Sequence, residues 1–327
     1  MTDANEEILT EMKSYFKNKN LKLPKGIHFF NESLGKYRME LNARKVQDEN
    51  MQVNDNAFEG WAISAYMTLK DKVNIKIILD VNGVFEYEQY EKNGHLNRFL
   101  YRAMRFSEQY EWLELSQYLQ EQINAFYKFI SDGRFINNLA DSEPGIKKIH
   151  NNENIMESML AKPGALMGIV GDEFDIGNNA VYRQLPVGLF KDEESDTTNV
   201  FTGDKSAIDL WTWNKDEFCL VELKTLNKKV GKQDIVTETF FYANYMRDLL
   251  CEDGLFTLNS GKKKNDRGYS NILNNSFKKI NGMMLADKYH PMITDKTIDI
   301  LNAGKIKEIH YVRVTYPYDQ LMGKQKN

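Results

Sequence analysis

The alternation of apolar and polar positions divides the chain into two patterned regions joined by a polar stretch. Residues 1–130 combine runs of strand period with longer runs of helical spacing. Residues 131–153 contain glycine, proline and asparagine with little apolar periodicity, which is typical of a linker. A regular pattern resumes at residue 154. The sequence therefore predicts an N-terminal α+β module over 1–130, a linker over 131–153 and a second domain over 154–327.

Within the first module, the pattern predicts a short opening helix, four strands and a long helical segment. Ile8, Met12 and Phe16 fall on one side of the opening helix. The helical segment covers Leu96–Phe129, with one break near Glu111. The module contains no catalytic motif, which favours a role in recognition or assembly. The predicted strands are Ile27–Asn31, Lys36–Lys45, Phe58–Met67 and Asn74–Asp80.

The second domain reads as an α/β unit whose strands are followed by helices. A helix is expected first, and it is stopped by Pro163-Gly164. A β-hairpin is expected over residues 206–224. The other predicted elements are, in chain order, a helix over Asn154–Ala161, a strand over Arg183–Phe190, a helix over Gln233–Leu250 and a strand over Ile306–Tyr316.

The hairpin carries the strongest chemical signal of the chain. Two β-like runs, residues 206–213 and 218–224, flank a polar turn. With a loop of two or four residues the runs pair end to end, and Asp209 lies opposite Glu222. Lys224 lies two residues beyond Glu222, on the same face of its strand. The flanking apolar residues predict a strand that is buried on both faces, where charged side chains are rare unless they are paired or functional.

Facing carboxylates on neighbouring strands repel each other unless a cation lies between them. Mg²⁺ prefers oxygen ligands and commonly takes one or two carboxylates, with water and phosphate oxygens completing its shell. Bound water becomes more acidic, and the metal stabilises charge on a phosphoryl group. A lysine on the same face can orient the attacking water or neutralise charge on the phosphate. The pattern therefore predicts a Mg²⁺ site suited to phosphodiester hydrolysis, with a structural ion-pair cluster as the alternative.

Asp209, followed by Glu222-Leu223-Lys224, resembles the motif of the PD-(D/E)XK, or restriction-endonuclease-like, nuclease superfamily. The resemblance extends over roughly residues 150–315 as a pattern of elements. Ile208 stands where the motif has proline. The resemblance implies a mixed central sheet flanked by helices. It also implies that Asp209 and Glu222 bind metal and that Lys224 assists the water.

Two further site residues are suggested by their order in the chain. The resemblance implies that a glutamate on the helix before the first core strand completes the metal site, and Glu157 has that place. Asn154, three residues earlier, leaves a helix capping box as the alternative. Gln233 is the candidate for a polar residue close to the catalytic lysine, with Glu238 as its alternative. Either could instead be one of several polar residues at a helix N-terminus.

Basic residues follow the hairpin and recur over residues 261–288, where aromatic residues lie between them. Such a mixture suits phosphate contact and base stacking, although it is also typical of a solvated loop. The candidates for nucleic-acid contact are Lys228, Lys229, Lys232, Lys262, Lys263, Lys264 and Arg267.

Composition narrows the class of protein. The 327 residues are 42% hydrophobic and 28% charged, which is ordinary for a soluble globular protein, and no run has the length of a membrane span. Two cysteines give neither a disulfide framework nor a zinc site, and a reducing cytoplasm is expected. The net charge of −4 argues against strong non-specific binding of nucleic acid, but it allows a locally basic groove.

The sequence thus predicts a cytoplasmic, Mg²⁺-dependent endonuclease that hydrolyses DNA, with Mn²⁺ able to substitute. Restriction or another defence against foreign DNA is the setting that the resemblance implies. A homodimer is a further possibility that the resemblance implies, because cutting both strands of a duplex needs two active sites. Two alternatives remain. One is a catalytically inactive nucleic-acid-binding or scaffold protein of the same fold. The other is a nuclease that acts on RNA or on branched DNA.

Overall fold

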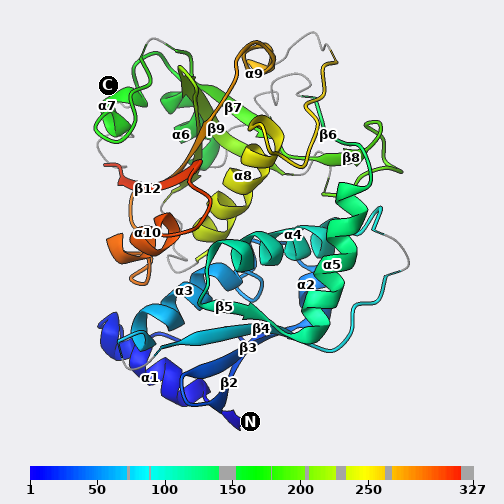
Figure 1. Cartoon of the computed structure of the whole chain (residues 1–327). Coiled ribbons are helices and arrows are strands. Elements are labelled where there is room, and N and C mark those ends of the chain that lie inside the picture. The colour runs from blue at the N-terminus through cyan, green and yellow to red at the C-terminus, as the bar shows by residue number, and fades with distance from the viewer. Residues whose placement is uncertain are drawn as a thin grey trace. The chain divides into compact units, whose positions relative to one another are not determined.

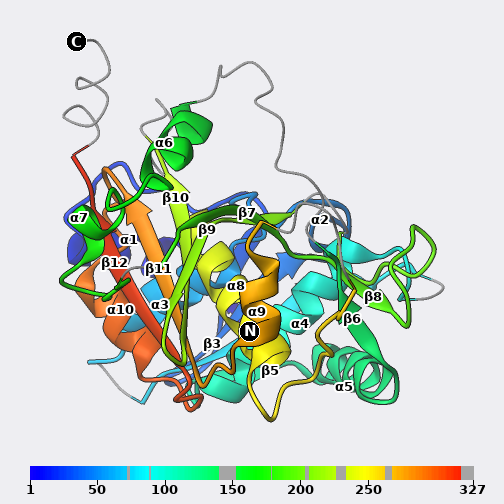
Figure 2. The same ribbon diagram turned by 90° about the horizontal axis from the view of Figure 1, so that it is seen from above.

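The chain folds as a mixed α/β protein with two compact units (Figures 1 and 2). The computed structural model describes residues 1–71, 74–87, 90–139, 152–177, 179–202, 206–225, 233–261 and 267–317. The first unit comprises residues 1–133, 232–238 and 290–306, and the second comprises residues 134–231, 239–289 and 307–327. The first passage between units falls within the predicted linker. The return of two later segments to the first unit was not predicted.

The first unit is built on a five-stranded sheet with the order β1-β2-β3-β4-β5. Strands β1, β2 and β3 are antiparallel neighbours, whereas β3, β4 and β5 run parallel. Its elements are β1 (Thr2–Asp3), α1 (Asn5–Tyr15), β2 (Ile27–Ser33), β3 (Lys36–Asn42), α2 (Ala43–Asp48), α3 (Phe58–Leu69), β4 (Lys76–Asn82), α4 (Gly94–Gln109), β5 (Leu113–Leu115), α5 (Gln117–Ser131) and α10 (Asp295–Asn302).

The second unit is built on a sheet with the order β12-β11-β10-β9-β7. Strands β7, β9 and β10 are antiparallel neighbours, whereas β10, β11 and β12 run parallel. Its elements are β6 (Phe135–Asn137), α6 (Asn152–Leu160), α7 (Met167–Val170), β7 (Tyr182–Pro186), β8 (Leu189–Lys191), β9 (Ala207–Asn214), β10 (Glu217–Lys224), α8 (Asp234–Leu250, of which the part from Thr239 belongs here), α9 (Tyr269–Asn274), β11 (Lys279–Ala286) and β12 (Ile309–Thr315).

The two sheets share one strand plan. Each begins with three antiparallel strands and continues with two parallel ones, which are joined through helix-containing crossovers as parallel strands require. The third strand of each sheet also ends alike. Strand β3 closes on Glu40-Leu41-Asn42 and β10 closes on Glu222-Leu223-Lys224. His28 pairs with Glu40 on the neighbouring strand of the first sheet. The first unit therefore has the glutamate of the motif but neither its aspartate nor its lysine.

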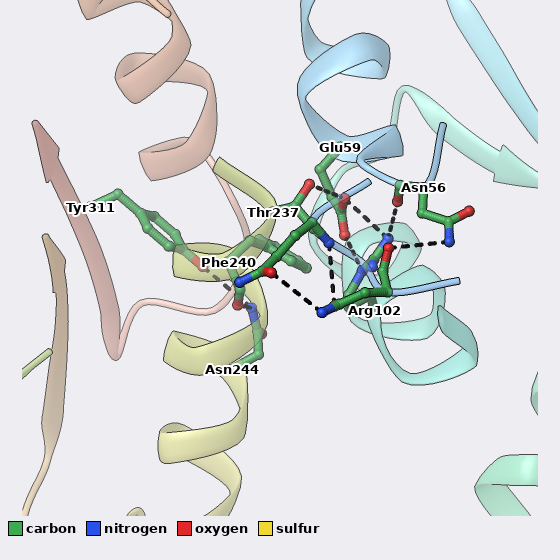
Figure 3. A network of polar contacts seen from close by, with 9 residues as sticks. Asn56, Glu59, Arg102, Thr237, Phe240, Asn244 and Tyr311 are labelled. Carbon is green, nitrogen blue, oxygen red and sulfur yellow. Dashed lines mark hydrogen bonds and ion pairs between the residues drawn. The ribbon is translucent and has the colours of Figure 1, made fainter. Parts of the chain in front are cut away.

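Helices cover both faces of the second sheet. Met156 and Leu160 of α6 join a buried cluster with Cys219, Val221 and other residues on one face. The opposite face packs against α8, where Asn244 Nδ2 donates hydrogen bonds to the Phe240 carbonyl (2.8 Å) and to the Tyr311 hydroxyl (3.3 Å) (Figure 3). Gly282 of β11 permits this approach, because a Cβ there would lie 3.0 Å from Thr239 Cγ2.

Most of the strongly periodic segments form the predicted elements. These are α1, β2, β4, α8, β12 and the β9–β10 hairpin. The strand predicted over Lys36–Lys45 ends earlier, at Asn42. The Asn42 side chain accepts a hydrogen bond from the Lys45 amide (3.1 Å) and so caps α2. Their apolar spacing or the turn between their strands is visible in the sequence, although β4, α8 and β10 are buried almost throughout.

The strand predicted over Phe58–Met67 is wrong, because the segment forms helix α3. All of α3 except Tyr66 is buried, so its apolar run shows no period that separates helix from strand. The predicted helical segment over Leu96–Phe129 is broken as expected near Glu111, although the break contains strand β5. Short edge strands of this length leave almost no periodic signal.

Two predictions for the second unit are also corrected. The single strand predicted over Arg183–Phe190 is two strands, β7 and β8, which belong to different sheets. Pro186 ends β7, because proline has no amide hydrogen for the sheet ladder. The segment 261–288, predicted as a basic patch for nucleic-acid contact with a solvated loop as the alternative, contains the interior strand β11, and seven of the eight residues of β11 are buried. In the part of the chain that the structure describes, no helix has the length and apolar character needed to cross a membrane.

Candidate functional site

The β9–β10 hairpin has the register predicted from the sequence. Trp213 pairs with Phe218 across a two-residue turn, and the described pairs continue to Leu210 with Val221. The next step of this register places Asp209 opposite Glu222. Strand β10 is buried except at its two ends, as predicted.

The Asp209 side chain binds the backbone of β10 just beyond the last described pair of β9 and β10. Its Oδ2 accepts a hydrogen bond from the Leu223 amide (2.9 Å), so the carboxylate turns toward β10. Glu222 is only 1% exposed and lies on the face that α8 covers, whereas Lys224 at the strand end is half-buried. The Tyr316 hydroxyl donates to the Lys224 carbonyl (3.1 Å) and fixes this strand end. The structure therefore holds the three motif side chains on a rigid, mostly buried pair of strands.

A fourth residue, Gln184 of β7, links Asp209 to Glu157. Its Nε2 lies 2.9 Å from Glu157 Oε2 and 3.5 Å from Asp209 Oδ1. Arg183 Nη2 also lies 3.1 Å from Glu157 Oε2. Gln184 has a positive φ of 54°, a strained conformation for a residue with a side chain. This backbone turns the amide toward both carboxylates, so Glu157 and Asp209 belong to one polar cluster.

The Glu157 side chain is 2% exposed. Burial, followed by repulsion from the Asp209 carboxylate, raises the pKa of Glu157 to about 7. The capping-box alternative is excluded by the bounds of α6, because Asn154 lies inside the helix and not at its N-terminus. Near neutral pH, Glu157 is therefore poised between its neutral and charged forms beside Asp209.

Glu157→Gln is expected to stabilise the metal-free protein at pH 8 but not at pH 5. The pKa of Glu157 is raised on folding, so its favourable contribution is complete below about pH 4.5 and is lost as the pH rises through about 7. The loss is on the order of 3 kcal/mol. Urea unfolding of both proteins in EDTA at pH 5 and pH 8 measures it. A difference between the proteins that does not change with pH would contradict the assignment.

Gln233 and Glu238 make their described contacts within the first unit. Gln233 is 1% exposed, and its Nε2 lies 3.5 Å from Ser64 Oγ and 3.2 Å from Met292 Sδ. Glu238 accepts a hydrogen bond from the side-chain amide of Gln52. These are the contacts of packing residues. A role for either side chain beside Lys224 stays a prediction.

Among the candidates for nucleic-acid contact, Arg267 is the one that the structure describes. Its Nη1 donates to the Gln184 carbonyl (2.5 Å), which brings a guanidinium to the strand that links Glu157 and Asp209. The other candidates lie outside the described residues, and they are Lys228, Lys229, Lys232, Lys262, Lys263 and Lys264.

Sequence reasoning missed Arg183 and Gln184. The signal was present, because two polar residues begin an otherwise apolar strand. The pairing of β7 with β9 explains the position of Gln184. Arg183 pairs with Leu210 and Leu185 pairs with Ile208, so Gln184 lies opposite Asp209. A register for β7 could not be counted from the sequence, since a long connection separates it from β9.

The donor chemistry of the site fits Mg²⁺. The register brings together two carboxylates, which match the oxygen ligands and the ligand number that this ion commonly takes from proteins. Among the described residues, no three His, Cys, Asp or Glu side chains form a group that could hold a metal. Asp209, Glu222 and Glu157 are therefore not gathered as one three-carboxylate cluster. Two protein carboxylates would leave the other ligands of the ion to water and phosphate oxygens.

Comparison of the chain with protein-family models, with curated protein sequences and with solved structures found no match.

Proposed function

We propose that the second unit is a Mg²⁺-dependent nuclease that hydrolyses DNA phosphodiester bonds. The observation that carries the proposal is the register of the β9–β10 hairpin, which leads to Asp209 opposite Glu222 with Lys224 on the same face. The mixed sheet with helices on both faces supports the resemblance to the PD-(D/E)XK superfamily. A restriction-endonuclease-like core is part of the proposal.

The carboxylates of Asp209 and Glu222 would hold the ion. Glu157, which does not form one three-carboxylate group with them, would lie beside the pair through Gln184. Mg²⁺ bound there supplies a more acidic water and stabilises charge on the phosphate. Lys224 places an ammonium on the same face, where it orients the water or neutralises charge that develops on the phosphate. Gln184 holds the carboxylates of Glu157 and Asp209 in position through one amide nitrogen.

The first unit is proposed to bind and not to cut. Its sheet has the same strand plan, but His28 and Asn42 stand where the second sheet has Asp209 and Lys224. A histidine and an amide supply neither the carboxylate pair nor the ammonium on which the proposed hydrolysis depends. This difference also gives a matched control, since Glu40 has the same place on β3 that Glu222 has on β10.

The purified protein is expected to cleave plasmid DNA with Mg²⁺ or Mn²⁺ and not with EDTA. Single-stranded DNA, a branched DNA junction and RNA in parallel reactions assign the substrate. Preferential cleavage of RNA or of the junction would keep the hydrolytic site and change its substrate. No cleavage of any substrate with either metal would instead favour the catalytically inactive binding protein.

A further inference from the structure

The first unit contains a cavity of about 830 Å³. None of the residues that line it is one of the proposed catalytic residues. It is bounded by the end of α3, the start of β4, the connection from α4 to β5, and α10. Lys36 pairs with Lys76 at this end of the first sheet, whereas Glu40 lies toward the other end of β3. The volume is in the range of small-ligand sites.

Aromatic rings form one wall of the cavity. Tyr66 and Trp112 stack with their ring centroids 4.4 Å apart and their planes 9° from parallel. Phe106 packs edge-on against Trp112 from behind the wall, at 5.6 Å and 86°. Both stacked rings are half-buried, so each keeps some surface in contact with solvent. The rings are therefore held rigidly before any ligand arrives, and ordering them costs little entropy on binding.

Four lysines and two acidic residues surround this wall. Lys76 Nζ donates to the Glu111 carbonyl (2.6 Å), and Lys305 forms an ion pair with the Glu111 carboxylate (3.1 Å). The Lys70 side chain is exposed, and no hydrogen bond or ion pair joins its ammonium to a described residue. The exposed Lys296 ammonium lies 5.5 Å from the centre of the Tyr15 ring. The rim is positive in a chain whose net charge is −4.

Stacked aromatic rings beside ammonium groups are suited to recognise a nucleobase together with its phosphates. Base–aromatic stacking contributes about 1–3 kcal/mol per base and tolerates any sequence, while lysines bind the backbone. We propose that this cavity binds an unpaired nucleobase and its flanking phosphates in a single-stranded segment of nucleic acid. The inference rests on the proposed nuclease function and adds single-stranded character to its substrate.

Binding is tested with the whole 327-residue chain in EDTA, so that cleavage plays no part. Fluorescence anisotropy with a labelled oligothymidylate gives the Kd, and a salt series gives the number of phosphate contacts. The double reversal Lys70→Glu/Lys296→Glu is expected to weaken binding at least tenfold. It should also reduce the magnitude of the slope of log K against log salt by about 1.4. Lys19→Glu/Lys22→Glu makes the same change in net charge on exposed residues outside the cavity.

Trp112 supplies a local readout of stacking. Oligonucleotide binding is expected to quench tryptophan fluorescence in the wild type, and Trp112→Phe should remove the quenching while keeping most of the affinity. Thermal melts of each variant show whether the fold is retained. Trp61 and Trp211 are buried and contribute little to the change. Trp213 is half-buried, and Trp213→Phe is the control variant in which the quenching should persist.

Mononucleotides in a parallel titration identify the source of the base. Affinity for a mononucleotide equal to that for the oligonucleotide would assign the cavity to a free nucleotide and overturn the single-strand proposal. Equal weakening in the cavity and control reversals, or unchanged quenching in Trp112→Phe, would also overturn it. Binding is measured in EDTA and cleavage is measured with metal. A protein that binds the oligonucleotide but does not cleave DNA would therefore contradict the proposed nuclease activity and not the proposed binding site.

Discussion

Asp209→Asn, Glu222→Gln and Lys224→Met are each expected to lower metal-dependent DNA cleavage at least about a hundredfold while the protein stays folded. The first two remove carboxylates that the β9–β10 register brings together, and the third removes the ammonium on the same face. The rate of plasmid nicking under single-turnover conditions measures the effect. Mg²⁺ should also raise the melting temperature of the wild type by mass action, and much less that of Asp209→Asn.

Glu40→Gln is the matched control for Glu222→Gln. Glu40 lies third from the end of β3, as Glu222 does on β10, and both precede a leucine. Cleavage by Glu40→Gln should equal that of the wild type, because His28 and Asn42 do not complete a catalytic set around it. Equal losses of cleavage in Glu40→Gln and Glu222→Gln would contradict a catalytic role for the β9–β10 hairpin. Wild-type cleavage by all three site variants would contradict it as well.

Arg102→Met is expected to lower the free energy of unfolding of the first unit by about 3–5 kcal/mol. Arg102 and Glu59 are 2% and 0% exposed, and Arg102 Nε lies 2.7 Å from Glu59 Oε1 (Figure 3). Arg102 Nη2 also donates to the Asn56 carbonyl (2.6 Å), and Thr237 Oγ1 donates to Glu59 Oε2 (2.8 Å). Loss of the guanidinium leaves a buried carboxylate without its ionic partner.

A double-mutant cycle isolates the pair. Glu59→Leu/Arg102→Met should cost less than the sum of the two single changes, because it leaves neither charge buried alone. Lys36→Met is the control, since Lys36 and Glu114 form an ion pair in which each side chain is 39% exposed. That change should cost about 0–1 kcal/mol in urea unfolding. Strictly additive effects at Glu59 and Arg102 would show that the network does not act as a unit.

Features that depend on residues close together in the chain could be predicted from the sequence alone. A two-residue turn and antiparallel pairing fix the register of the β9–β10 hairpin, so the placement of Asp209 near Glu222 could be counted from the turn. Helices α1 and α8 were read from their apolar spacing. These signals survive in the sequence because the interacting residues are separated by few positions or because one face of the element is polar.

Features whose partners are distant in the chain, or whose elements are buried throughout, became clear only from the folded structure. Helix α3 and strand β11 are surrounded by apolar residues, which erases the period that distinguishes helix from strand. Gln184 meets Glu157 only because α6 and β7 pack together. Gln233 meets Ser64 only because residues 232–238 return to the first unit. Packing selects such partners by shape and by the need to satisfy buried polar groups, and neither is visible in local sequence.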